Sequence, residues 1–275
     1  MINKFRNYLF LSLGALALGA FLFTFKCLFY SSNEPHQANV ATDDTAQKLC
    51  PEQFLKHVDT LMTNTWDQFK NTSNVTMQDC HHFLKEHGNT IKENAEKARA
   101  TKAKMCKPLQ QDTISLVQGI LKDFNIQPNN IKIVPYNGKG SPAAADDYTM
   151  YIDEELLGTF SPQAQQFIIA HEISHYTHKD YTMESALLNL VDDKSQKDKH
   201  CLNAFAQFTE SRADIVAMLK DKKYATAGIH FFNELIARYG NEPCHSHPLS
   251  SDRLKIAQEI TAMHTAQEQN KVQTA

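Results

Sequence analysis

Four features are missing from this sequence, and each absence excludes a class of protein. No cluster of Lys and Arg of the kind that binds nucleic acid is present, so we expect no nucleic-acid partner. There is no internal repeat, and beyond residue 30 no apolar run is long enough to cross a membrane. Six cysteines in 275 residues do not indicate a small disulfide-stapled domain. The 42% of hydrophobic residues suffices for one sizeable core, with a small helical subdomain beside it.

Residues 1–30 differ from the rest of the chain. Lys4 and Arg6 precede an uncharged run, Asn7–Phe25, that is rich in Leu, Ala, Gly and Phe. As a helix this run would rise about 28 Å, close to the thickness of the hydrocarbon core of a bilayer. It is long for a signal peptide and lacks a convincing cleavage site, so we predict a transmembrane signal anchor over residues 1–30; a cleaved signal peptide that yields a soluble periplasmic product is the alternative. The basic flank predicts that the remaining chain lies on the extracytoplasmic (periplasmic) side.

The spacing of apolar residues predicts an α+β fold that is mainly helical. Residues 31–48 are predicted to be a polar linker, 49–125 a helical N-terminal region, 126–268 the main domain and 269–275 a frayed tail. The predicted helices and amphipathic stretches lie at residues 51–71, 76–105, 112–124, 162–178, 181–191, 202–219, 225–239 and 250–268. Strands are predicted at 131–136 and 148–153, and loops at 137–147 and 192–200.

The most informative motif is His-Glu-Ile-Ser-His at residues 171–175. Helical positions four apart share a face, so His171 and His175 can direct two imidazoles at one point, which suits a tetrahedral zinc ion. Glu172 lies between them and can act as a general base on a metal-bound water. The alternative is an idle motif, with two surface histidines on a helix. The context favours zinc, because Ser161-Pro162 supplies a helix start and the apolar segment that follows predicts a buried helix.

A catalytic zinc needs a third protein ligand and an open position for water. The metzincin pattern is excluded, because Tyr181 stands where its third His would be and His178 where its Gly would be. We predict that His178 itself either contacts a metal ligand without binding the metal or lies at the surface. Glu210 is the predicted third ligand, and Asp214, one turn further along, can accept a hydrogen bond from the far nitrogen of a ligand His. The alternative for both is an exposed acidic face.

A third motif follows a loop that contains Gly and Pro. The ordered set HEISHYTHKD, ESRAD and HSHPLSSDRL resembles the gluzincin peptidases related to HtpX, the CAAX prenyl protease and the OMA mitochondrial proteases. The resemblance covers roughly residues 130–260. It implies a zincin-like metallopeptidase fold with a small sheet before the motif helix, and one Zn²⁺ per chain. The residues that match the family's zinc ligands are His171, His175 and Glu210; Glu172 matches its catalytic base, and Asp214, His247 and Arg253 match its remaining motif positions.

The resemblance implies a zinc metalloendopeptidase whose substrates are proteins or peptides. Several relatives span the membrane many times, whereas this chain has one candidate span, which argues against an intramembrane role. We therefore expect an anchored peptidase in envelope protein quality control. The alternatives are a non-catalytic zinc-binding envelope chaperone or assembly factor, and a membrane-anchored helical scaffold with an accidental motif.

Two further expectations concern how a substrate would be held. His247 is the candidate donor to the oxyanion, with Arg253 orienting either it or the substrate; a loop histidine packed beside the metal is the alternative. The strand at 148–153 is predicted to pair with an extended substrate, and the alternative is an ordinary strand of the sheet. The predicted substrate-binding residues are Tyr148, Thr149, Met150 and Tyr151.

Five cysteines follow the predicted anchor, which is an odd number. In an exported domain they could form disulfides, with Cys201–Cys244 as the favoured pair because both flank segments expected to converge on the site. Cys80–Cys106 could join two helices and leave Cys50 over. Five reduced and mostly buried thiols are the alternative.

Overall fold

We analysed a computed structural model of the chain. The residues it describes are Asp67, 75–103, 106–137, 140–191, 196–242 and 247–273. The predicted anchor, the linker and all but Asp67 of the first predicted helix lie outside these residues. Within the described ranges, no helix is both long enough and apolar enough to cross a bilayer.

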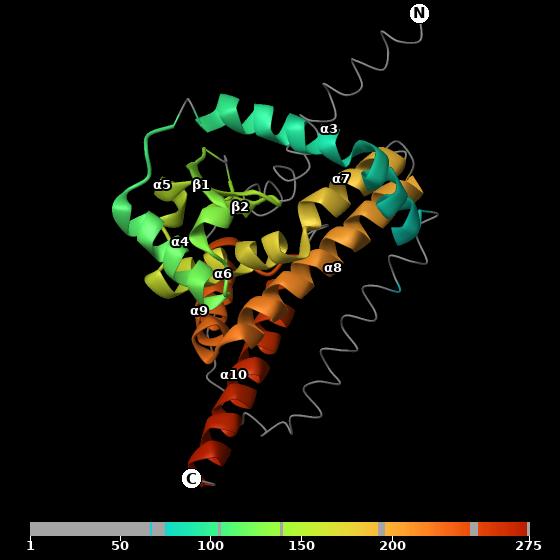
Figure 1. Cartoon of the computed structure of the whole chain (residues 1–275). Helices are drawn as coiled ribbons and strands as arrows, with labels where there is room; N and C mark the ends of the chain where they lie inside the picture. The colour runs from blue at the N-terminus through green and yellow to red at the C-terminus, as the bar shows by residue number, and fades with distance from the viewer. Residues whose placement is uncertain are drawn as a thin grey trace, which may run out of the picture.

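The described chain is mainly helical with one small sheet, which confirms the predicted α+β class (Figure 1). The helices are α3 (Met77–Ala103), α4 (Gln111–Asp123), α5 (Glu154–Leu157), α6 (Pro162–His178), α7 (Asp180–Leu190), α8 (Gln196–Lys220), α9 (Lys222–Tyr239) and α10 (Ser250–Gln273), with a 3-10 turn, η1, at Pro128–Asn130. The strands are β1 (Lys132–Pro135), β2 (Ala143–Ala145) and β3 (Thr149–Ile152).

The sheet has the order β1-β3-β2, so the last strand in the sequence is the central one. β1 runs parallel to β3, with Lys132 opposite Thr149, and β2 runs antiparallel to it, with Ala144 opposite Tyr151. The prediction of a loop over residues 137–147 was wrong at β2. Alanine is a weak strand former, so three alanines in a row gave no sequence signal for a strand.

α6 is the centre of the main core and contacts α9, α8, β2 and α4. Its side chains Phe167, Ile169 and Ile173 are fully buried. The Phe167 ring lies 5.2 Å from that of Phe232, in an edge-on arrangement. A Cβ atom on Gly228 would lie 3.1 Å from the Phe167 ring, so glycine is what allows α9 to approach α6 this closely. α6 is therefore fixed on several sides.

The start of α6 is as predicted. Ser161 caps the helix by accepting a hydrogen bond from the backbone N–H of Ala164 at 3.2 Å, and Pro162 occupies the first helical position. The helix ends at His178. The next residue, Lys179, has a φ of 56°, a left-handed conformation that redirects the chain into α7. The abrupt turn sets the position of the first residues of α7 relative to the end of α6.

Two helix boundaries differ from the prediction. α8 begins at Gln196, within the residues predicted to be a charged loop, and α10 continues to Gln273, through most of the predicted tail. Both segments are polar and contain Gln and Lys, which are good helix formers. They lack the apolar periodicity that marks a buried face, so no sequence pattern predicted a helix there.

A second, smaller core, called here the side core, joins α3, α7 and the first half of α8. Its buried residues are Cys80, Ala186, Leu187, Cys201, Ala204 and Phe205. The two predicted disulfides are contradicted, because Cys80, Cys106 and Cys201 form none in the structure; Cys50 and Cys244 lie outside the described residues. Burial raises the pKa of the Cys80 thiol to about 11, as expected for a thiol that packs like an apolar side chain.

Candidate metal centre

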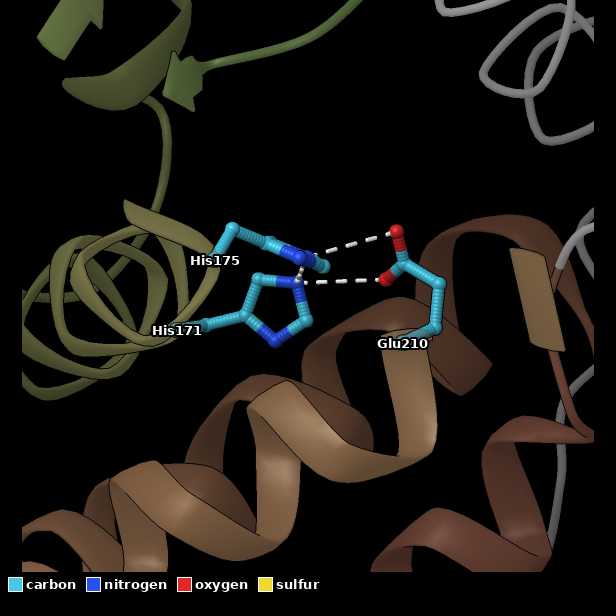
Figure 2. A group of neighbouring side chains, drawn as sticks. All are labelled: His171, His175 and Glu210. Carbon is cyan, nitrogen blue, oxygen red and sulfur yellow. Dashed lines mark hydrogen bonds and ion pairs between the residues drawn. The ribbon is translucent and has the colours of Figure 1, made fainter. Parts of the chain in front are cut away.

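The structure brings together the three residues predicted to bind a metal. His171 and His175 point from α6 toward Glu210 on α8 (Figure 2). The two Nε2 atoms lie 3.0 Å apart. His171 Nε2 is 3.1 Å from Glu210 Oε2, and His175 Nε2 is 3.5 Å from Glu210 Oε1. All three side chains are largely buried, and their candidate ligand atoms lie within 4.8 Å of one another.

The hydrogen bonds of the two imidazoles test whether these residues fit a cation. His171 Nδ1 lies 2.8 Å from Asp214 Oδ1, and His175 Nδ1 lies 2.8 Å from Asp180 Oδ2. A carboxylate only accepts, so each Nδ1 carries the proton, and each Nε2, which faces the other ring and Glu210, is the nitrogen that can bind a cation. Positive charge among the three side chains, either a proton on Nε2 or a metal ion, offsets the repulsion between these atoms. The donor set therefore fits a divalent metal ion such as zinc.

The charges at this site shift the pKa values in the same sense. Burial lowers the pKa of His171, but the carboxylates of Asp214 and Glu210 outweigh it, and the net pKa is raised. The pKa of His175 is raised well above its ordinary value, because Glu210 and Asp180 outweigh the burial of the ring. Burial raises the pKa of Glu210, but the nearby imidazoles of His247, His175 and His171 hold it well below its ordinary value. The site thus strongly favours positive charge between its ligands.

Asp214, predicted to lie behind a ligand histidine, is itself held by Arg253. Arg253 donates from Nε to Asp214 Oδ2 at 2.6 Å and from Nη2 to Asp214 Oδ1 at 2.9 Å. Its guanidinium also lies 4.7 Å from the centre of the Phe232 ring. Arg253 was expected to orient His247 or the substrate, and the structure places its guanidinium on Asp214. The residue supports a candidate metal ligand from α10, through one intervening carboxylate.

Asp180 was missed by the sequence analysis. It is the first residue of α7, and the left-handed turn at Lys179 brings its carboxylate back to His175. Arg212 on α8 donates from Nη2 to Asp180 Oδ1. In the sequence, Asp180 stands five residues after the second His of the motif. That spacing brings the two side chains together only because of the turn at Lys179, so it did not predict the contact. Each of the two candidate histidine ligands is therefore backed by a carboxylate and an arginine.

Glu172 lies beside the three candidate ligands and is 7% exposed. Burial raises its pKa above the ordinary value, although the nearby His175 and His171 partly oppose this. It also bonds the backbone N–H of Ala145 on β2, and its Oε2 is buried with no hydrogen-bond partner. A buried carboxylate oxygen with no partner is costly, so it is suited to receive a proton from a bound water.

Two other histidines had been weighed for this site. His247 lies within it, with Nε2 2.9 Å from Glu210 Oε2 and 11% of its side chain exposed. His178 lies at the exposed end of α6, and its Nδ1 is 2.8 Å from the carbonyl oxygen of Ser174. Thus only His247 joins the candidate ligands. Glu184 on α7 was not considered from the sequence; burial, followed by the charge of Glu210, raises its pKa to about 7.

The predicted pairing of an extended substrate with residues 148–153 is wrong. β3 lies between β1 and β2, so its backbone is already bonded on both sides. Of the four residues named, Thr149 and Met150 are fully buried, while Tyr151 donates its hydroxyl to Asp146 and Tyr148 lies beneath the Lys92 ammonium, 4.8 Å from the ring centre. These residues build the sheet, and its edges are elsewhere.

The sheet has two edge strands, β1 and β2, and the residues of β2 are buried. Asp146 N–H donates to Thr149 and Asp153 N–H donates to Pro142, so residues 142, 144 and 146 turn their backbone groups toward β3. Bonding in an antiparallel pair alternates, so Ala143 and Ala145 turn theirs away from β3. The Ala145 N–H reaches Glu172, which shows that this edge faces the candidate metal centre.

Comparison of the chain with protein-family models, with curated proteins and with solved structures found no match in any of the three.

Proposed function

We propose that this chain is a zinc metalloendopeptidase of the gluzincin type, with a zincin-like fold. The observation that supports it most is the buried group of His171, His175 and Glu210 with the unpartnered Glu172 oxygen beside it. The first three supply nitrogen and oxygen ligands and leave a position open, as in catalytic rather than structural zinc sites. Zinc held there would supply Lewis acidity, polarising a carbonyl and lowering the pKa of a water molecule.

Glu172 would carry the proton during hydrolysis. Its carboxylate accepts a proton from water as the water oxygen adds to the carbonyl carbon of the peptide. It then gives that proton to the amine nitrogen as the C–N bond breaks, so the residue returns to its starting state. The raised pKa suits both steps, because a base with a pKa nearer neutrality is also an effective acid.

His247 is the proposed contact for the reacting peptide. His247 Nε2 lies beside the carboxylate of Glu210 and can turn an N–H toward negative charge that develops on the carbonyl oxygen.

We also propose that the peptidase is held at a membrane by the predicted anchor over residues 1–30, with its catalytic domain on the extracytoplasmic side. The chain beyond the anchor is acidic, because it holds all 31 acidic residues but lacks three of the 28 basic ones. An enzyme in that location would act on envelope proteins.

The test is hydrolysis of unfolded casein by the wild type and by Glu172→Gln, both assayed for bound metal. We expect Glu172→Gln to retain the metal but to lose activity by a factor of about 10² to 10⁴, the usual contribution of a positioned general base. Glu155→Gln, at an exposed position on α5, is the matched control and should cleave like the wild type. Full activity in the Glu172→Gln variant would refute the proposal.

A further inference from the structure

A pocket of about 730 Å³ is lined by residues of α3, α7, α8 and the end of α6. Its volume falls within the range of about 300–1,000 Å³ that is typical of small-molecule sites. The described residues that line it include none of the candidate metal ligands, nor Glu172 or His247. The pocket is therefore separate from the proposed catalytic site and has the capacity to hold a ligand of its own.

Most of the wall is apolar. Met77 and Leu84 contribute from α3, Met183 from α7, and Phe205 and Phe208 from α8. Thioether and aromatic side chains of this kind adapt to an elongated apolar body, because methionine is unbranched and the rings offer flat faces. Phe205 also belongs to the side core, so this part of the wall is fixed by packing.

The charged part of the described lining is basic. Lys179 and Arg212 contribute to it, beside the polar side chains of His81, His178 and Thr182, and no acidic side chain appears among the described lining residues. Arg212 uses one terminal nitrogen to hold Asp180, and its guanidinium lies 5.0 Å from the centre of the Phe208 ring. A guanidinium and an ammonium at the border of an apolar pocket are suited to an anionic group.

The kind of backbone around the pocket narrows the ligand class further. Its described walls are mostly helical, and the backbone groups of a helix interior are bonded to one another. A peptide in the pocket would bring several amide groups and find no free strand edge to bond them, which is unfavourable. A ligand with one anionic end and a hydrocarbon body needs polar partners at that end alone.

We propose that this pocket binds a long-chain carboxylate, that is, a fatty acid. The carboxylate would lie beside the Arg212 guanidinium and the Lys179 ammonium, and the hydrocarbon chain would lie against Met183 and Phe208. This site is independent of the proposed peptidase activity. Because Arg212 also holds Asp180, the bound carboxylate would lie close to the support of His175, one of the two histidines on the candidate metal.

The first arm of the test varies the ligand and leaves the protein intact. Palmitate, its methyl ester and acetate are titrated against the full chain by displacement of a fluorescent fatty acid, below the concentration at which palmitate aggregates. We expect saturable binding of one palmitate per chain. The ester, which lacks the charge, and acetate, which lacks the chain, should each bind at least about tenfold more weakly, since a charged hydrogen bond and a buried hydrocarbon each contribute that much. Equal binding of palmitate and its ester, or no binding of palmitate, would overturn the proposal.

The second arm varies the protein. Met183→Trp should fill the pocket and reduce palmitate affinity at least tenfold, whereas Leu219→Trp, at a 38% exposed position outside the pocket, should not. Lys179→Gln should weaken binding about threefold, as expected for an exposed charge, and Lys85→Gln on α3 serves as its control. Lys179 is exposed, so its variant remains informative even if Met183→Trp fails to fold. If the Lys179→Gln variant and the Met183→Trp variant each bound palmitate as tightly as the wild type, the assignment would be contradicted.

Discussion

Two carboxylate–arginine pairs flank the candidate metal centre, and they differ chiefly in how exposed the arginine is. The inner pair, Asp214–Arg253, lies in the main core, where Arg253 is 6% exposed and packs on Phe232. The outer pair, Asp180–Arg212, lies beside the proposed fatty-acid pocket, where Arg212 is 26% exposed. Both pairs hold the far nitrogen of a histidine. The two pairs use the same residue types but differ in the exposure of the arginine. Comparing variants of the two pairs therefore separates an effect on metal binding from an effect on the stability of the fold.

A third pair extends this comparison to the surface. Asp123 at the end of α4 lies 2.5 Å from Lys223 on α9, and the two side chains are 39% and 50% exposed. It also accepts a hydrogen bond from the hydroxyl of Tyr224 at 2.5 Å. The surface pair contacts no candidate metal ligand in the described interactions. The three pairs thus form a series in which stabilisation of the fold should follow burial, while an effect on the metal should be confined to the first two.

The largest effect is expected when the inner arginine is removed. Arg253→Met leaves the charge of Asp214 buried without its partner, and should lower the free energy of unfolding by about 3–5 kcal/mol. Arg212→Met, the matched change in the outer pair, should cost less, about 1–3 kcal/mol, because Asp180 is also buried but Arg212 is 26% exposed and donates one hydrogen bond to it, where Arg253 donates two to Asp214. Urea unfolding of the metal-free proteins measures both. An equal decrease in the free energy of unfolding in the two variants would show that the two pairs stabilise the fold equally, contrary to the prediction.

An intermediate effect is expected on metal affinity when either carboxylate is replaced. Asp214→Ala and Asp180→Ala should each weaken zinc binding about 10- to 100-fold, because each frees a histidine to rotate and makes it a poorer ligand. Competition with a chromophoric chelator measures the affinity. Asp123→Ala is the matched control and should bind zinc like the wild type. If only one of the two site variants lost affinity, the proposed equivalence of the two pairs would be wrong.

The smallest effect is expected at the surface pair, where pH provides the measurement. The hydrogen bonds and charge of Lys223, followed by the Tyr224 hydroxyl, hold the pKa of Asp123 below its ordinary value. A carboxyl group whose pKa is lower in the folded protein than in the unfolded chain stabilises the fold. This stabilisation is complete at pH values above the unfolded pKa and is lost as the pH falls through the folded pKa. Asp123→Asn should therefore be less stable at neutral pH by at most about 1 kcal/mol, and the difference should vanish as pH is lowered from about 5 toward 3. A difference that persisted at acid pH would show that charge is not its cause.

Much of the fold followed from local signals. The Ser161-Pro162 start and the apolar run placed α6 correctly, and Gly240, with a φ of 77°, ends α9 as expected of a glycine C-cap. β2 could not be found, because its three alanines favour a strand only when β3 lies alongside. The neighbours of a strand depend on long-range pairing, so the sequence alone did not show that β3 is the central strand.

The candidate site divides in the same way. Spacing on one helix brought His171 and His175 together, and a second helix supplied Glu210. Asp180 was missed because its position depends on the left-handed turn at Lys179, a conformation that lysine rarely adopts. Pairings across helices, such as that of Arg253 with Asp214, depend on how α10 packs against α8, which no local pattern encodes.

The central claim is that His171, His175 and Glu210 hold one metal ion. Elemental analysis of the chain, purified without chelator and dialysed against a zinc buffer, tests it most directly. The account predicts one zinc per chain in the wild type and none in His171→Ala/His175→Ala, with His81→Ala/His82→Ala on the exposed face of α3 as the control that keeps its zinc. A wild type without zinc, or equal zinc in the wild type and the His171→Ala/His175→Ala variant, would contradict it.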